Sequence, residues 1–174
     1  MITIVQWDIT TQDTQAIVNS ANPTLNPGWW ISWMIHKKAW IEFSVNLKMY
    51  LKTNSKAYLE TWEAIITEAG LLPNKFVIHT VWPKYDLHKE NREELLKQCY
   101  VSCLDLCVQH NITTISFPSI STWIYGCPID KASVIAIDTV VNYTKKHNHF
   151  EEVRFVLFNE HDFEIYSKVT LNYR

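Results

Sequence analysis

Apolar residues in this chain gather in short runs that alternate with longer segments of helical spacing. Phe76–Val81 and Val153–Phe158 are continuous apolar runs typical of buried strands, whereas Glu90–Gln109 repeats its apolar positions with the period of an amphipathic helix. The same criteria predict further strands at Ile2–Gln6, Ala16–Asn19, Ala64–Thr67 and Thr114–Phe117, and further helices at Ile31–Trp40, Lys131–Lys145 and Asp162–Leu171. We expect the helix at Ile31 to continue irregularly as far as Tyr50.

Strands that alternate with helices of this length indicate an α/β fold, in which helices cover both faces of a mostly parallel sheet. A length of 174 residues suits one domain with a sizeable core. Because no internal repeat, low-complexity segment or linker is visible, we expect a single domain spanning residues 1–174.

Ligands of such sheets bind beyond the carboxyl ends of the strands, so the residues that follow each predicted strand are the first candidates for a site. Asp8 follows the first strand, Asn22 and Gly28 follow the second, and Asn159 follows the last. The segment Pro118–Gly126 follows the strand at Thr114. Polar and loop-forming residues therefore converge on one rim of the predicted sheet.

Tryptophan is abundant in this chain and glycine is scarce. There are eight tryptophans and three glycines, although glycine usually makes up about 7% of a protein. Most of the tryptophans stand in turn and loop contexts, which favour residues that tolerate positive φ or allow a ligand close to the backbone. The eight are Trp7, Trp29, Trp30, Trp33, Trp40, Trp62, Trp82 and Trp123.

Charge and hydropathy exclude several classes of partner. Sixteen basic and 18 acidic residues give a net charge of −2, which argues against a nucleic-acid partner. No apolar stretch approaches the ~18 residues of a membrane span, and the N-terminus lacks the pattern of a signal peptide. We expect a cytoplasmic, monomeric protein without a cofactor or a membrane partner.

The four cysteines do not resemble a disulfide framework. Cys99, Cys103 and Cys107 recur every four residues on the predicted helix Glu90–Gln109, which puts them near one face. A metal cluster is one interpretation, but no companion His or Cys pair has metal-ligand spacing. We therefore favour small apolar core residues and predict no metal site.

Several ordered motifs over nearly the whole chain resemble those of the macrodomains, the ADP-ribose-recognising α/β/α modules. The family's Gly-Asp-Ile corresponds to Trp7-Asp8-Ile9, and its Asn-Ala-Ala-Asn to Asn19-Ser20-Ala21-Asn22. Its glycine-rich loop with Ala-Ile-His-x-Ala-Ala-Gly corresponds to residues 28–40, and its Pro-x-Ile-Ser-Thr-Gly-x-Tyr-Gly-x-Pro to residues 118–128. Thr61-Trp62-Glu63-Ala64 and His79-Thr80-Val81-Trp82-Pro83 match two further motifs, and all eight tryptophans fall on family glycines.

The resemblance implies a three-layer α/β/α macrodomain-like sandwich with a central mixed sheet, and a ligand site for ADP-ribose or an ADP-ribosylated protein. Asp8, beside Ile9, would accept a hydrogen bond from the adenine amino group, and Asn22 would touch the distal ribose. Loop amides would hold the diphosphate, since anions bind well to backbone N–H groups without a basic patch. The implied diphosphate loops and adenine border comprise Gly28, Trp29, Trp30, Ile31, Ser121, Thr122, Trp123, Ile124, Tyr125, Phe158 and Asn159.

The resemblance implies Asn22 and Ser32 as catalytic residues, but this set lacks the family's acidic residue. Ser32 occupies the position where hydrolase-type macrodomains carry an Asp that helps to activate water, and serine is a poor base without a partner. His36 could be a base, or it could pack or cap locally on its helix. Asp8 also has an alternative role, since with Thr10 it could cap a turn.

Three functions compete for this sequence: an ADP-ribose-binding module, a mono-ADP-ribosyl hydrolase or O-acetyl-ADP-ribose deacetylase, and a macrodomain scaffold whose pocket tryptophan has blocked or re-purposed, as in an engineered variant. A residue other than glycine in a glycine-only backbone region costs about 1–3 kcal/mol, and each indole near the phosphate loops takes up ligand volume. These costs favour the blocked scaffold for this chain. A fourth possibility, an aromatic groove for single-stranded nucleic acid, suits the indoles but not the charge.

Overall fold

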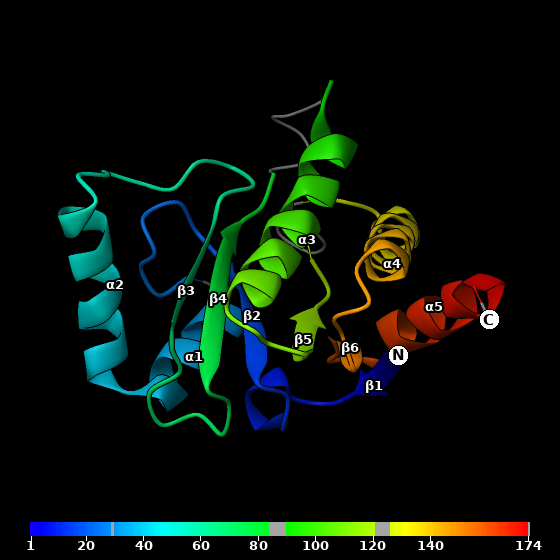
Figure 1. The fold of residues 1–174 in the computed structure, drawn as a ribbon, viewed down its shortest axis with the longest axis horizontal. Helices are drawn as coiled ribbons and strands as arrows, with labels where there is room; N and C mark the ends of the chain where they lie inside the picture. Colours follow the sequence, from blue (N-terminus) through cyan, green and yellow to red (C-terminus); the bar gives the residue numbers. More distant parts are fainter. Residues whose placement is uncertain (29, 84–89, 121–125, 174) are drawn as a thin grey trace.

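The structure is a computed structural model that describes residues 1–28, 30–83, 90–120 and 126–173. Within these residues, six strands form one sheet in the order β1-β6-β5-β2-β4-β3 (Figure 1). All neighbours pair in parallel except β3, which runs antiparallel to β4 at one edge, so the sheet is mixed. The strands are β1 (Ile2–Gln6), β2 (Ala16–Ala21), β3 (Ala64–Glu68), β4 (Phe76–Val81), β5 (Thr114–Pro118) and β6 (Glu152–Leu157).

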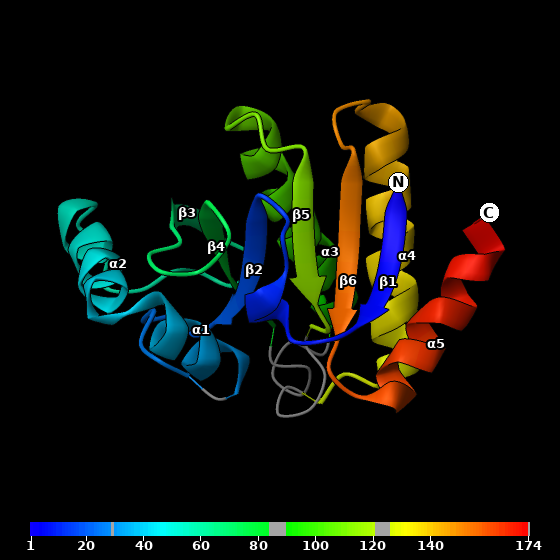
Figure 2. The same cartoon turned by 90° about the horizontal axis from the view of Figure 1, so that it is seen from below.

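Helices cover both faces of the sheet, which gives the three-layer α/β/α sandwich. The helices are α1 (Ile31–Ala39), α2 (Ile41–Thr53), α3 (Arg92–Gln109), α4 (Ile129–Lys146) and α5 (Glu160–Thr170), with short 3₁₀ turns η1 (Ile9–Thr11) and η3 (Leu171–Tyr173). One hydrophobic cluster joins α3, α4 and α5 to the sheet, and a second joins α1 and α2 to the opposite face. Figure 2 shows α3 and α4 behind the strands and α1 and α2 beside β2 and β4. The predicted architecture is confirmed.

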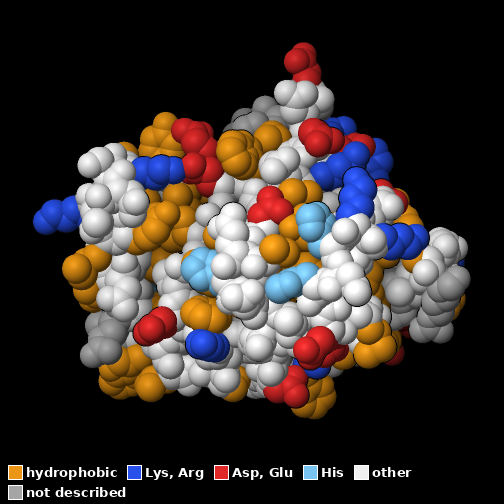
Figure 3. Space-filling view, in the orientation of Figure 1, with side chains coloured by type: hydrophobic (Ala, Val, Ile, Leu, Met, Phe, Trp, Pro, Cys, Tyr) orange, Lys and Arg blue, Asp and Glu red, His pale blue; other side chains and the backbone are white. Residues whose placement is uncertain are grey.

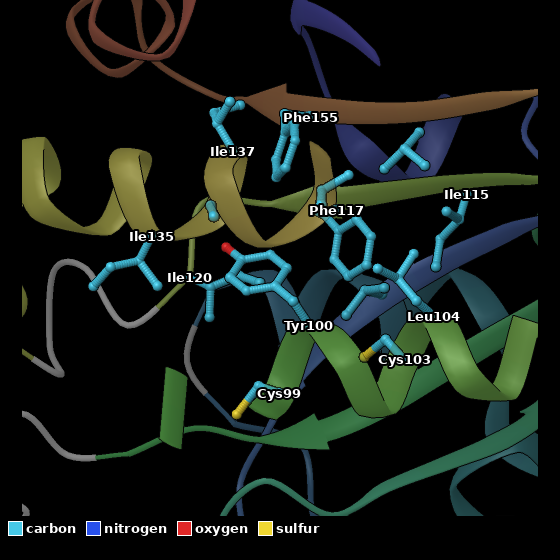
Figure 4. Close-up of a cluster of buried hydrophobic side chains, with 14 of the residues drawn as sticks. Cys99, Tyr100, Cys103, Leu104, Ile115, Phe117, Ile120, Ile135, Ile137 and Phe155 are labelled. Atoms are coloured by element: carbon cyan, nitrogen blue, oxygen red, sulfur yellow. The ribbon is translucent and has the colours of Figure 1, made fainter. Parts of the chain in front are cut away.

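The larger cluster contains the cysteines of α3. Cys99, Cys103 and Cys107 are fully buried and unpaired. All three belong to this cluster, and Cys99 and Cys103 lie on the same helix as Tyr100, whose ring contacts that of Phe117 at 5.2 Å between centroids (Figure 4). Burial raises the pKa of the Cys99 thiol to about 12, so this thiol stays protonated. The prediction that these cysteines are apolar core residues is confirmed.

The helix predicted at Ile31–Trp40 ends at Ala39, and its expected irregular continuation toward Tyr50 is a separate helix, α2, which starts at Ile41. Trp40 stands between them at φ 79° and ψ 170°, outside the helical region. Next to this break, Gly70 has φ +63°, and a Cβ there would lie 2.2 Å from the carbonyl oxygen of Ala39. The backbone of Gly70 therefore packs directly against the end of α1.

Smaller differences concern element ends. Helix α5 begins at Glu160 rather than Asp162, because Asn159 accepts a hydrogen bond from the backbone N–H of Asp162 and caps the helix. Strand β6 ends at Leu157, so Phe158 lies beyond it. The surface in Figure 3 intermixes basic and acidic side chains. Among the described helices, none is long and apolar enough to span a membrane.

Candidate functional site

Asp8 lies directly beyond β1, where its carboxylate caps the turn η1. One oxygen, Oδ1, accepts hydrogen bonds from the backbone N–H of Thr10 at 2.9 Å and from its hydroxyl at 2.6 Å. The alternative interpretation of Asp8, as a turn cap with Thr10, is therefore confirmed. Its neighbour Ile9 is buried in the smaller core cluster.

The second carboxylate oxygen of Asp8 is also occupied. The ammonium of Lys38, on α1, donates to Oδ2 at 2.9 Å and to the hydroxyl of Thr10 at 2.6 Å. Partial burial raises the pKa of Asp8, but the hydrogen bonds from Thr10 and Lys38 outweigh it and hold the pKa below its ordinary value. Sequence reasoning missed this pair, although one signal was present: Lys38 stands where the matched motif has alanine.

Asn22 follows β2 and organises its own loop. Its side-chain oxygen accepts hydrogen bonds from the backbone N–H and the hydroxyl of Thr24, at 3.1 and 2.9 Å. Its side-chain nitrogen donates to the backbone carbonyl of Asn26 at 2.7 Å. The hydroxyl of Ser32 accepts a hydrogen bond at 3.2 Å from the backbone N–H of Gly28, four residues earlier. Both predicted catalytic side chains thus shape the backbone of one loop.

His36, on α1, contacts residues of α2. Its Nδ1 and the hydroxyl of Ser44 are 2.8 Å apart, and its ring contacts that of Phe43 edge to face, with centroids at 5.2 Å. Burial lowers the pKa of His36, so the ring is neutral at physiological pH. These contacts correspond to the local packing role that the sequence left open for His36.

Trp30 and Phe158 meet across the rim. Trp30 immediately precedes α1, and Phe158 immediately follows β6, yet their ring centroids lie 5.6 Å apart at an interplanar angle of 77°. Ile31, the first residue of α1, is partly buried against the smaller core cluster. The predicted ligand-contacting residues Trp29, Ser121, Thr122, Trp123, Ile124 and Tyr125 lie outside the described residues.

The described tryptophans fall into two groups by backbone conformation. Trp30, Trp40 and Trp62 have φ of 42°, 79° and 76°, in the region that favours glycine. Trp7, Trp33 and Trp82 have no positive φ. Trp82 is buried against Tyr100, whereas the other five described tryptophans are exposed. The expectation that these turns call for positive φ therefore holds at three described positions.

Two cavities are described, and neither is lined by Asp8 or Asn22. The first, of about 260 Å³, lies between α3 and the start of β3 and includes Trp62 and Glu63. The second, of about 390 Å³, lies against α1 and α2. Within the described part of the chain, no group of His, Cys, Asp or Glu side chains is placed to hold a metal ion.

Comparison with known proteins identifies the class. Residues 18–136, more than half of the chain, match the Macro domain family. The chain is 36% identical to O-acetyl-ADP-ribose deacetylase 1 of Pantoea vagans, over 97% of each protein. Among solved structures, it resembles the Oceanobacillus iheyensis macrodomain with ADP, with a TM-score of 0.92 and 38% identity over 98% of this chain and 89% of the other. It also resembles the Trypanosoma brucei macrodomain in complex with ADP-ribose, with a TM-score of 0.85 and 27% identity over 97% of this chain and 68% of the other.

The protein has a six-stranded mixed sheet between two helical layers and a polar rim at the strand ends. It therefore belongs to an established class of α/β/α modules. The chain belongs to the macrodomain family.

Proposed function

We propose that this chain is a macrodomain whose ADP-ribose cleft is closed by its own side chains, so that it binds ADP-ribose weakly and does not hydrolyse ADP-ribosyl groups. The contact between Trp30 and Phe158 carries the proposal. The resemblance assigns Trp30 to the diphosphate loop and Phe158 to the border of adenine, so a ligand would have to part these two rings.

Parting the rings has a free-energy cost. Edge-to-face aromatic pairs contribute about 0.5–1.5 kcal/mol beyond the area that they bury, and a ligand must replace that contact with its own. Phosphate oxygens must also come within about 3 Å of loop amides to form hydrogen bonds, and an indole in their path keeps them further away.

The ion pair between Lys38 and Asp8 also disfavours ADP-ribose binding. Asp8 is the residue that would accept a hydrogen bond from the adenine amino group, and in this chain the Lys38 ammonium already donates to it. A neutral amino group is a weaker donor to a carboxylate than an ammonium. Adenine would therefore have to displace a stronger partner from Asp8.

The catalytic residues also argue against turnover. Ser32 stands at the family's acidic position, and its hydroxyl is buried and bonded to the backbone of Gly28. A neutral hydroxyl in that state cannot take a proton from water, so the water-activating step has no base at this position.

Calorimetric titration with ADP-ribose tests the proposal. We expect little or no binding to the unmodified chain, and binding to appear in Trp30→Gly combined with Lys38→Ala. Trp62→Gly removes a different exposed indole at positive φ and serves as the matched control, which should stay without binding.

One observation favours the alternative of a functional ADP-ribose reader or deacetylase, the activity named for the Pantoea vagans relative. The Trp30 side chain is 62% exposed, so it can swing toward solvent and open the cleft. Micromolar binding of ADP-ribose to the unmodified chain, abolished by Asp8→Ala, would establish this alternative and end the closed-cleft proposal.

A further inference from the structure

The second cavity has two indoles in its lining, and none of its lining residues is among the predicted ADP-ribose contacts. It has a volume of about 390 Å³, within the range of small-molecule pockets, and is lined by Pro27, Trp33, His36, Lys37, Trp40 and Ser44. Its walls come from the loop before α1, from α1 and from the first turns of α2. Figure 2 shows these two helices next to each other at one side of the molecule.

Trp33, Lys37 and Trp40 line this cavity. Trp33 and Lys37 stand four residues apart on α1, a spacing that puts them on one face of the helix, and Trp40 follows directly after the end of α1. Trp33 is 50% exposed and Trp40 is 58% exposed, so each indole leaves about half of its surface in water. A planar aromatic ring that contacts both indoles would remove part of this surface from water, which is favourable.

The cavity carries one available positive charge. The Lys37 ammonium lies 4.7 Å from the centroid of the Trp33 ring. In the described part of the chain it has no carboxylate within ion-pair distance, whereas its neighbour Lys38 is paired with Asp8. An anionic group on a ligand would meet the Lys37 ammonium over the Trp33 ring.

The His36–Ser44 pair supplies a hydroxyl to the same cavity. His36 is 7% exposed and neutral, and within the described residues its buried Nε2 has no hydrogen-bond partner. Nε2 is unpaired in either tautomer, so the contact with Ser44 can form with the proton on Nδ1. In that tautomer Nδ1–H donates to Ser44, which leaves the Ser44 hydroxyl proton free to bond an anion.

We propose that the cavity between α1 and α2 binds a small planar aromatic carboxylate. The ring contacts the Trp33 and Trp40 indoles, and the carboxylate accepts hydrogen bonds from the Lys37 ammonium and the Ser44 hydroxyl. Charge selects this class, because the described lining residues include one cation and no carboxylate. This site is separate from the closed cleft, and its occupancy does not depend on ADP-ribose.

Calorimetry with 2-naphthoate tests the proposal on the full chain. We expect a Kd below about 1 mM and at least tenfold weaker binding by cyclohexanecarboxylate, which lacks a π face, and by 2-naphthalenemethanol, which lacks the charge. Trp40→Gly should weaken 2-naphthoate binding about tenfold, and Trp33→Ala provides a second test should the first variant fold poorly. Lys37→Met, which keeps the apolar stem, should weaken binding several-fold.

Matched controls separate this cavity from general adhesion to exposed indoles. Trp62→Gly removes an exposed tryptophan elsewhere, and Lys48→Met removes an exposed lysine of α2. Both should leave 2-naphthoate binding unchanged, and excess ADP-ribose should not compete. Equal losses in the controls, no loss in the cavity variants, or equal binding of all three probes would overturn the proposal. Because none of these measurements depends on ADP-ribose binding, failure here leaves the closed-cleft proposal untouched.

Discussion

At the scale of single residues, the backbone at Trp62 stores strain that glycine would release. Trp62 has φ 76° and leaves 43% of its surface exposed, so its indole gains only partial burial. We expect Trp62→Gly to be more stable than Trp62→Ala by about 1 kcal/mol, because both variants lose the indole but only alanine keeps a Cβ at positive φ. Urea unfolding of the two variants measures the difference, and equal stabilities would show that this turn is unstrained.

His79 makes folding stability depend on pH. Its ring is fully buried between Asn19, 3.1 Å from Nδ1, and Thr67, 3.0 Å from Nε2. Burial, followed by the nearby His36, lowers the pKa of His79 to about 3. The unfolded chain binds this proton near pH 6.5, so between those two values the unfolded state holds more protons and stability falls as pH falls.

The expected loss from His79 alone is about 1.4 kcal/mol per pH unit between pH 6 and pH 4. His79→Gln keeps polar contacts at this position but does not titrate. Chemical unfolding at several pH values should therefore give a shallower decline for the variant than for the parent chain. Parallel declines would mean that His79 is accessible to protons in the folded state.

At the scale of elements, strand and helix identities could be predicted because their hydrophobic periods are local. The helix end at Trp40 was also predicted, but the apolar pattern did not show that the continuation is a second regular helix set off by one residue at φ 79° and ψ 170°. The start of α5 could have been predicted, because Asn159 followed by Asp162 is a helix-capping pattern. The resemblance instead suggests a ligand-binding role for Asn159, and the described contacts of Asn159 do not test that role.

The cap of α5 provides an element-scale prediction. Asn159 accepts a hydrogen bond from the backbone N–H of Asp162 at 2.8 Å. Asn159→Ala should destabilise the fold by about 1 kcal/mol, because it leaves one N–H of the first turn without its partner. Asn159→Asp keeps an acceptor at the helix N-terminus and should retain most of the stability in the same urea titration. A neutral alanine variant would show that water replaces the cap.

At the scale of the whole molecule, the sequence places candidate residues at the strand ends but not the contacts between their side chains. Asp8 and Asn22 follow successive predicted strands, whereas Phe158 lies inside a predicted strand and is a candidate only through the macrodomain resemblance. Parallel topology brings strand ends to one rim. The contacts of Trp30 with Phe158 and of Lys38 with Asp8 join residues 128 and 30 positions apart along the chain. Neither a hydrophobic period nor a motif indicates where such side chains point. These contacts are therefore seen only in the folded structure.

Ligand-linked stability tests how the two contacts act together. A ligand that binds only the folded state raises stability by RT ln(1 + [L]/Kd), which is about 2.7 kcal/mol at a concentration of 100 Kd. Thermal melting of the unmodified chain should be insensitive to ADP-ribose, because the ligand would have to displace both the indole and the ammonium. Trp30→Gly and Lys38→Ala each remove one obstacle, so each should respond weakly and the double variant most strongly.

The comparison also separates blocking by the indole from its backbone strain. Trp30 has φ 42°, so Trp30→Gly both removes the indole and relaxes the backbone, whereas Trp30→Ala removes the indole alone. If the indole is the obstacle, Trp30→Ala with Lys38→Ala should respond to ADP-ribose nearly as well as the glycine version. If only glycine restores the response, the loop needs backbone freedom more than it needs space, and closure by the Trp30–Phe158 contact is not the cause.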